Sequence, residues 1–204
     1  MKNKKLYLSI LFLVLFIVNT ILVMTKNTVT FDDEVHLTVI STMSEFMSSF
    51  MRVMTFFGST IFMVCLCAVL FFVFLFKKHK KLAFSTAGIL IVSTILNNVV
   101  KWIVRRPRPE YIMVVEKSLS YPSGHMMASV TMYGFIIYLL NRSNISTTNK
   151  IIFTCLLSLL VLLIGTSRIY LGAHFVSDIL GGACLSLSLL FAFAFINDKK
   201  NLLD

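Results

Sequence analysis

Residues 59–76 read STIFMVCLCAVLFFVFLF, a run without a single charged side chain. A helix of about 20 apolar residues is long enough to cross the hydrocarbon core of a membrane. Ser59–Phe76 therefore predicts a membrane-spanning helix, and it indicates that the chain folds in lipid. Four lysines follow directly, a pattern typical of a cytoplasmic loop: Lys77, Lys78, Lys80 and Lys81.

Five other segments have the same apolar character and predict further spans. They are Leu6–Val23, Leu82–Val100, Met126–Leu140, Ile151–Thr166 and Phe175–Ile196. The fourth and fifth of the six spans are short, so we expect them to extend into flanking polar residues. The first lacks a convincing small-x-small cleavage site, so we expect a retained helix. The sequence thus predicts an all-α fold, a six-helix transmembrane bundle forming one domain over residues 1–204.

The overall composition agrees with this interpretation. A soluble domain carries about 25% charged residues, whereas only 14% of these 204 residues are charged and 57% are hydrophobic. A net charge of +10 would favour nucleic acid as the partner of a soluble protein. Because no separate basic domain exists, we expect a lipid bilayer and no nucleic acid. The sequence leaves the oligomeric state open.

The basic residues also predict an orientation. With the N-terminus inside, Lys4, Lys5, the 77–81 cluster and Lys199 all fall on the cytoplasmic side, as the positive-inside rule favours. Both termini are then cytoplasmic. Most of the remaining cations gather in two clusters on the extracytoplasmic side, and these clusters need another explanation.

The loop after the first span contains one more periodic element. Its apolar residues recur at helical spacing and fall within an arc of roughly 140°: Val39, Ile40, Met43, Phe46, Met47, Phe50, Met51, Met54 and Phe57. We therefore predict an amphipathic helix over residues 39–57, between spans one and two. Such a helix lies either in the outer membrane interface or against the bundle.

The first polar cluster, KWIVRRPRP, covers residues 101–109. It is either a snorkelling basic helix end followed by a proline stop or an anion site. Two prolines stiffen the backbone that carries Arg106 and Arg108, and guanidinium forks on a stiff backbone suit multi-oxygen anions. The cluster therefore predicts a phosphate-binding segment.

The second cluster, YPSGH, covers residues 121–125 and precedes the fourth span. A helix that begins here directs its free N–H groups toward Ser123 and Gly124, where an oxyanion can approach. The simpler interpretation is that Ser123 is an ordinary N-cap. His125 favours the functional one, because a titratable imidazole at a membrane edge requires a reason.

The third cluster runs from Ser167 to Asp178 and includes Arg168 and His174. His174 and Asp178 are four residues apart, so on a helix they share one face. An ionisable pair in a membrane helix is a functional hypothesis by default. A carboxylate that binds one ring nitrogen leaves the other free to attack. Structural glue and a proton relay are the alternatives.

Together the three clusters would place cations, a helix N-terminus, two histidines and an aspartate on one membrane face. Phosphoryl transfer requires charge stabilisation for the equatorial oxygens, an in-line nucleophile and an acid for the leaving oxygen.

At this point the chain resembles the type 2 phosphatidic acid phosphatases, the PAP2 family. The signature of that family is K-x6-R-P, then P-S-G-H, then S-R-x5-H-x3-D, and this sequence matches it at every position. The matching residues are Lys101…Arg108-Pro109, Pro122-Ser123-Gly124-His125 and Ser167-Arg168…His174…Asp178.

The resemblance implies a role for each matching residue. His174 would attack phosphorus and form a phosphohistidine, Asp178 would hold its imidazole, and His125 would protonate the leaving oxygen. The phosphate would be bound by Lys101, Arg108, Ser123, Gly124 and Arg168, with Arg106 in a supporting role. No metal or other cofactor is expected.

The implied activity is hydrolysis of a phosphate monoester or pyrophosphate of a lipid at the outer leaflet. Undecaprenyl pyrophosphate, phosphatidylglycerophosphate and phosphatidic acid are the candidate substrates. Two alternatives stay open: a lipid phosphotransferase, in which an alcohol replaces water, and a non-catalytic transporter of anionic lipids. A transporter needs the cations but has no evident use for an oriented imidazole opposite a second histidine.

Overall fold

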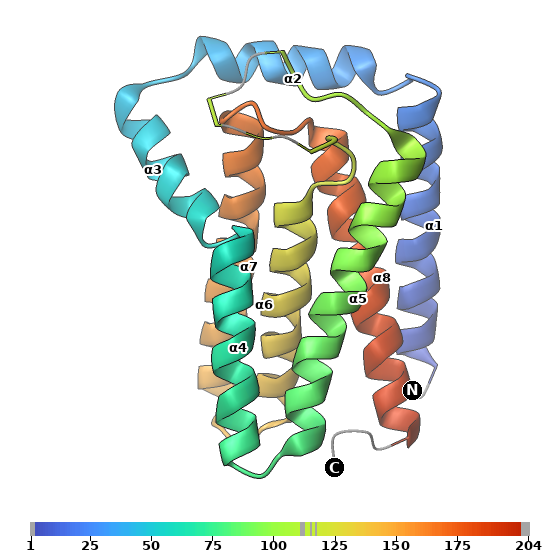
Figure 1. Ribbon diagram of the computed structural model, residues 1–204, viewed down its shortest axis with the longest axis vertical. Helices are drawn as coiled ribbons and strands as arrows, with labels where there is room; N and C mark the ends of the chain where they lie inside the picture. Colours follow the sequence, from blue (N-terminus) through green and yellow to red (C-terminus); the bar gives the residue numbers. More distant parts are fainter. Residues whose placement is uncertain (1–2, 111–112, 115, 117, 201–204) are drawn as a thin grey trace.

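The computed structural model describes residues 3–110, 113–114, 116 and 118–200, and within them the chain is helical and contains no strand (Figure 1). The described residues form eight helices: α1 (Lys4–Met24), α2 (Val29–Ser41), α3 (Glu45–Phe56), α4 (Thr60–Phe76), α5 (Lys80–Val104), α6 (Gly124–Arg142), α7 (Thr147–Tyr170) and α8 (Val176–Lys200). The predicted all-α class is confirmed, and each of the six predicted spans coincides with one long helix.

Five segments of the described chain are long and apolar enough to cross a membrane. They are α1, α5, α7, α8 and the stretch Glu45–Phe76, which joins α3 to α4. Helix α6 is not among them, so the count of six spans remains a prediction at this helix.

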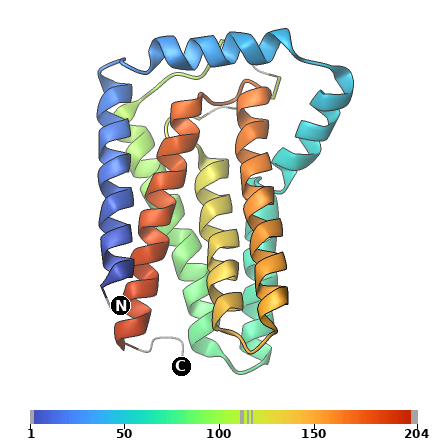
Figure 2. The same cartoon turned by 180° about the vertical axis from the view of Figure 1, so that it is seen from behind.

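The reason lies in the position of α6 at the centre of the bundle, between α5, α7 and α8 (Figures 1 and 2). Its side chains contact other helices rather than lipid, so polar residues are tolerated along it. Ser129 and Thr131 are fully buried there, beside Met132 and Phe135. Met132 also packs with Met63 of α4 in the largest apolar cluster of the described residues.

The single amphipathic helix predicted over residues 39–57 is wrong, because two helices occupy this region. Helix α2 ends at Ser41, and α3 begins after Ser44, which has extended backbone angles and caps the new helix by accepting a hydrogen bond from Met47 N at 3.3 Å. Tyr170 of α7 stabilises the break, since Ser44 N donates to its hydroxyl at 3.0 Å. The signal that the periodicity could not resolve was Ser44, a typical N-cap residue.

The two helices also lie differently. Helix α2 crosses one end of the bundle, whereas α3 descends obliquely beside α7 to meet α4 (Figure 1). Two placements were left open for the predicted helix, in the membrane interface or against the bundle. Helix α3, which covers most of its residues, packs against α7 and belongs to the apolar stretch that continues into α4.

The two ends of the bundle differ in what they carry. The described N- and C-terminal residues, the α4–α5 turn and the α6–α7 turn lie at the end away from α2 (Figures 1 and 2). The α5–α6 connection and the α7–α8 turn lie at the end that α2 crosses. All three polar clusters of the sequence therefore meet at this end.

Candidate active site

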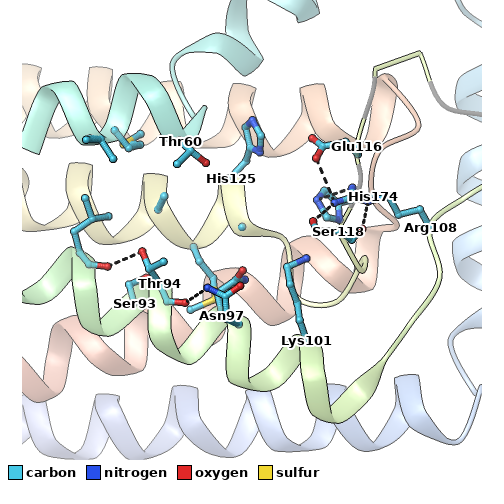
Figure 3. Close-up of a pocket in the computed structure, with 17 residues that line it drawn as sticks. Thr60, Ser93, Thr94, Asn97, Lys101, Arg108, Glu116, Ser118, His125 and His174 are labelled. Atoms are coloured by element: carbon cyan, nitrogen blue, oxygen red, sulfur yellow. Dashed lines mark hydrogen bonds and ion pairs between the residues drawn. The ribbon is translucent and has the colours of Figure 1, made fainter.

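A cavity of about 320 Å³ opens between α4, α5 and α6 and reaches the loops at the α2 end. The polar end of the cavity is lined by the side chains of Lys101, Arg108, Glu116, His125 and His174 (Figure 3). The rest of the cavity is lined by the apolar side chains of Met63, Val64 and Leu90 and by uncharged polar ones, including Thr60 and Ser93. One cavity thus joins a charged end to an uncharged, partly apolar region inside the bundle.

The end of α7 places His174 in this cavity. Gly172 has a φ of 68°, a conformation that glycine adopts without a steric penalty. Gly172 N donates to Ile169 O and Ala173 N donates to Arg168 O, both at 3.0 Å. This pair of bonds is a Schellman motif, which ends a helix and reverses the chain. His174 follows two residues later, in the loop before α8.

The buried ring of His174 has a defined neighbour at each nitrogen. Nδ1 lies 3.4 Å from Asp178 Oδ2 and 3.3 Å from Ser120 Oγ. Nε2 lies 3.3 Å from Arg108 Nη1, on the cavity side. With the proton on Nδ1 and held by Asp178, the lone pair of Nε2 is available toward the cations.

Asp178 is fully buried and satisfied on both carboxylate oxygens. Oδ1 accepts from Arg106 Nη1 at 2.8 Å, and Oδ2 accepts from Phe175 N at 3.0 Å and from the hydroxyl of Ser120. In the bond to Phe175 N, the third residue of α8 accepts from the backbone N–H of the N-cap residue, as in a capping box. The predicted pair of His174 and Asp178 therefore forms at a helix N-terminus rather than along a helix face.

The α5–α6 connection begins with a sharp change of direction. Arg105 has a φ of 52°, and this left-handed residue ends α5 before the Arg106-Pro107 step. The chain then crosses the end of the bundle (Figure 1). Arg108 is anchored there, since Nη1 donates to Ala173 O at 2.6 Å and Nε donates to Ser118 O at 2.7 Å.

Lys101, in the last turn of α5, is buried and lines the cavity. Its ammonium group donates to Leu119 O and, at 3.4 Å, to Ser120 O. The helix end does not snorkel away from the bundle but turns its charge inward.

Arg168, in the last turn of α7, is 2% exposed. Nη1 donates to Thr55 Oγ1 at 2.8 Å, Nη2 binds Glu116 Oε1, and Nε is buried without a partner among the described residues. The other oxygen of Glu116 lies 3.5 Å from Arg108 Nη2. A carboxylate thus sits between two guanidinium groups, and this marks a position that suits an anion.

The start of α6 forms another wall of the cavity. Ser123 is a buried N-cap whose Oγ accepts from Met126 N at 3.4 Å, as the simpler interpretation of the sequence had it. Gly124 and His125 line the cavity. The first N–H groups of a helix have no backbone partner within it. That of Met126 is capped by Ser123, whereas those of Gly124 and His125 have no hydrogen-bond partner among the described residues.

The guanidinium of Arg106 does not face the described cavity, as a phosphate-binding group would, but binds two carboxylates of the protein. Its guanidinium donates to Asp178 Oδ1 at 2.8 Å and to Asp32 Oδ2 at 2.7 Å, and it lies 4.2 Å from the ring centroid of Phe175. The anions that it binds are carboxylates of the protein. Of the three arginines between Lys101 and Pro109, only Arg108 lines the described cavity.

The structure adds polar residues that the sequence analysis missed: Asp32, Glu116, Ser118, Ser120 and Ser177. Ser120 directly precedes the second cluster, Ser118 lies three residues before it, and Ser177 directly precedes Asp178, so closeness in the sequence was an available signal for them. Asp32 had none, because it stands in the acidic run Asp32–Glu34 that reads as a solvated helix face.

Burial also sets the protonation of the loop residues. Desolvation lowers the pKa of His174 to about 4, although the carboxylate of Asp178 acts in the opposite direction. The imidazole is therefore neutral near pH 7, as a nitrogen nucleophile must be. Burial lowers the pKa of Arg108 as well, and a bound anion would offset that cost.

The sequence comparisons agree with the geometry. Residues 82–201 match the PAP2 superfamily. The chain is 38% identical over 108 residues to phosphatidylglycerophosphatase B of Bacillus subtilis, an alignment that covers 52% of this chain and 53% of that protein. The matched region thus spans about half the length of this relative.

The fold is similar to two solved structures. The crystal structure of a transmembrane PAP2-type phosphatidylglycerolphosphate phosphatase from Bacillus subtilis superposes with a TM-score of 0.85 at 27% identity, over 97% of this chain and 98% of that one. Aquifex aeolicus LpxE gives a TM-score of 0.57 at 21% identity, over 82% of this chain and 95% of the other. The second likeness concerns the fold alone.

Proposed function

The chain belongs to the PAP2 superfamily, and from this membership and the geometry of the cavity we propose that it is a membrane lipid phosphatase acting through a phosphohistidine on His174. Residues 1–204 would act as one catalytic domain. The reaction is hydrolysis of a phosphate monoester or pyrophosphate of a lipid, and it needs no metal ion because the cations of the site supply the charge.

One observation carries this proposal. The buried His174 has Asp178 at Nδ1 and a cationic neighbour, Arg108, at Nε2. A carrier of anionic lipids would require the cations but not this oriented imidazole. The carboxylate of Glu116 between Arg108 and Arg168 supports the same interpretation, because it occupies a position where phosphoryl oxygens would be stabilised.

The residues suit a two-step displacement. In the first step, Nε2 of His174 forms a bond to phosphorus while the bond to the lipid oxygen breaks, and His125 gives a proton to that oxygen. In the second step, His125 takes a proton from water, the water oxygen attacks phosphorus, and the N–P bond breaks to release inorganic phosphate. Lys101, Arg108 and Arg168 stabilise the five-coordinate state, with Ser123 and Gly124 as hydrogen-bond donors.

The membrane placement follows from the two ends of the bundle. We expect six passes, with α6 as the fourth although its composition is less apolar. The lysine-rich α4–α5 turn and both termini would be cytoplasmic. The catalytic end beneath α2 would then face the outer leaflet, close to headgroup level. The apolar part of the cavity, at Met63, Val64 and Leu90, supports a lipid as the substrate.

Phosphatidylglycerophosphate is the first candidate substrate, because the similar sequence and the similar crystal structure from Bacillus subtilis both carry the name of a phosphatase of that lipid. Phosphatidic acid carries the same phosphate monoester on another lipid. Undecaprenyl pyrophosphate carries a diphosphate, whose P–O–P bond would break to release a lipid phosphate. The lipid part of the leaving group would lie toward the apolar residues of the cavity in each case, so both the lipid and the phosphate group would decide among them.

Phosphate release from these three lipids, measured in detergent with EDTA present, tests the proposal. We expect release by the wild-type protein, fastest from phosphatidylglycerophosphate, and none above background from His174→Ala. Unchanged release by His174→Ala would exclude the nucleophile, and a requirement for Mg²⁺ would exclude the metal-free reaction. Replacing water by an added alcohol as acceptor would distinguish a phosphotransferase.

A further inference from the structure

We infer that Asp32 of α2 is a positioning residue for the catalytic pair, acting through Arg106 and Ser177 to hold Asp178 against His174. This inference rests on the proposed function. It assigns a role to a residue that lies outside all three sequence clusters, on a helix that contributes nothing to the described cavity wall.

Asp32 is a buried carboxylate, 1% exposed, on a helix that otherwise lies across the surface of the bundle. Its Oδ1 accepts from Ser177 N at 3.0 Å, and its Oδ2 accepts from Ser177 Oγ at 2.5 Å and from Arg106 Nη2 at 2.7 Å. Burial of a carboxylate is costly unless it is paired and hydrogen-bonded. Here the partners are Ser177, which precedes Asp178 in the sequence, and Arg106, which forms an ion pair with Asp178.

Arg106 connects the two carboxylates. Its Nη2 binds Asp32 while its Nη1 binds Asp178 Oδ1 at 2.8 Å and Ser177 Oγ at 2.6 Å. The guanidinium also stacks on Phe175, 4.2 Å from the ring centroid. A planar fork held at both ends fixes the direction from which it approaches Asp178.

The first turn of α8 is held by the same two carboxylates. Asp178 accepts from Phe175 N, and Asp32 accepts from Ser177 N, so two of the free N–H groups at this helix start are satisfied. The second of these acceptors comes from a residue 145 positions away in the sequence. Helix α2 therefore anchors the turn on which the catalytic aspartate stands.

Loss of Asp32 would change the balance of forces on Asp178. Arg106 would keep only one carboxylate partner, and the backbone N–H of Ser177 would lose the carboxylate to which it donates. We expect Asp178 to move toward Arg106 and away from His174 Nδ1, a contact that is already 3.4 Å long. The ring would then no longer be held in a single tautomer with Nε2 free to attack.

The test compares Asp32→Asn with Glu34→Gln, a neutralisation at an exposed position of the same helix. For Asp32→Asn we expect kcat per active site to fall about 10- to 100-fold, the size of a roughly 1 Å misplacement, while KM stays within about twofold. Glu34→Gln should match the wild type in both. Active sites are counted from the product burst. A loss of folded protein alone, with kcat per active site unchanged, would overturn the inference.

The second measurement reads the ring directly and does not depend on turnover. In ¹⁵N-histidine-labelled protein, with His174 assigned from His174→Gln, we expect the Nδ1–H tautomer in the wild type and averaged tautomers in Asp32→Asn. The same tautomer in both proteins would overturn the inference, even if kcat had fallen. If the wild type released no phosphate from any lipid, the proposed function would fail, and the tautomer comparison would still decide the role of Asp32.

Ser177→Ala covers the case in which Asp32→Asn does not fold. It removes the hydroxyl between Asp32 and Arg106 and keeps both charges. We expect the same direction of change in kcat and tautomer with a smaller amplitude. Wild-type kcat and a wild-type tautomer in folded Ser177→Ala protein would contradict the inference.

Discussion

The two histidines of the cavity are built in opposite ways. His174 stands in a loop yet is 2% exposed, and its ring has defined neighbours at both nitrogens. His125 stands on a regular helix, half-buried, and its ring has no hydrogen-bond partner among the described residues. We interpret the difference by role: a nucleophile gains from being held in place, whereas an acid must exchange its proton with the leaving oxygen and with water.

The largest effect is expected from Asp178→Asn, which removes the carboxylate that fixes the ring of His174. An amide of the same shape cannot keep the Nδ1–H tautomer of His174, and loss of an orienting carboxylate in comparable sites lowers kcat by about 10⁴-fold. The measurement is the rate of phosphate release from phosphatidylglycerophosphate. Asp198→Asn, at the far end of the same helix, is the matched control and should retain wild-type activity. A loss below tenfold for Asp178→Asn would contradict the role of the pair.

The role of the other histidine is tested by His125→Asn, which removes the proposed general acid. We expect kcat on a lipid phosphate to fall by about 10²- to 10⁴-fold, because the alkoxide leaving group requires a proton. The loss should be much smaller with p-nitrophenyl phosphate, whose leaving group departs without one. Equal losses on the two substrates would show that His125 acts otherwise than as the acid.

A further prediction concerns the pH at which the buried ring of His174 becomes protonated. Because burial lowers the pKa to about 4, the ring stays neutral from pH 8 down to about pH 5, and it becomes protonated and non-nucleophilic as the pH falls through about 4. An unperturbed histidine would titrate near 6.5. The ¹⁵N shifts of the assigned ring measure the midpoint, and a midpoint near 6.5 would mean that the ring is hydrated.

The smallest expected effect concerns Glu116, whose carboxylate lies between Arg108 and Arg168. Glu116→Gln removes the competing carboxylate, so vanadate should inhibit more strongly. The gain should not exceed about fivefold, because a partly exposed ion pair is worth up to about 1 kcal/mol. Weaker inhibition by vanadate in this variant would indicate that Glu116 assists anion binding instead.

Much of the fold could be predicted from the sequence, because each span is a long apolar run with its own boundaries. The helices at Ser59, Ser123 and Ser146 begin at serine caps, which are local signals. The region of residues 29–57 was harder, since α2 and α3 are oriented by contacts such as that of Ser44 with Tyr170. Such contacts leave no trace in local periodicity.

The site shows the same division. His174, Asp178, Arg108 and Lys101 could be identified as candidates because their spacing repeats a known signature. The partner of Arg106 could not, because the second and third predicted spans separate Asp32 from Arg106 in the sequence, and only the placement of α2 brings the two together. Charge pairing across distant elements depends on tertiary structure, and one sequence does not encode it in any local pattern.

The central claim is that His174 becomes phosphorylated, and a trapped phosphoenzyme tests it most directly. His125→Asn protein mixed with ³²P-labelled p-nitrophenyl phosphate and quenched in alkali should carry label, because the activated leaving group departs while hydrolysis of the intermediate is slowed. The label should be acid-labile and alkali-stable, as expected of an N–P bond, and absent when His174→Ala is added to the same variant. Label that persists without His174, or an acid-stable phosphoryl group, would contradict the account.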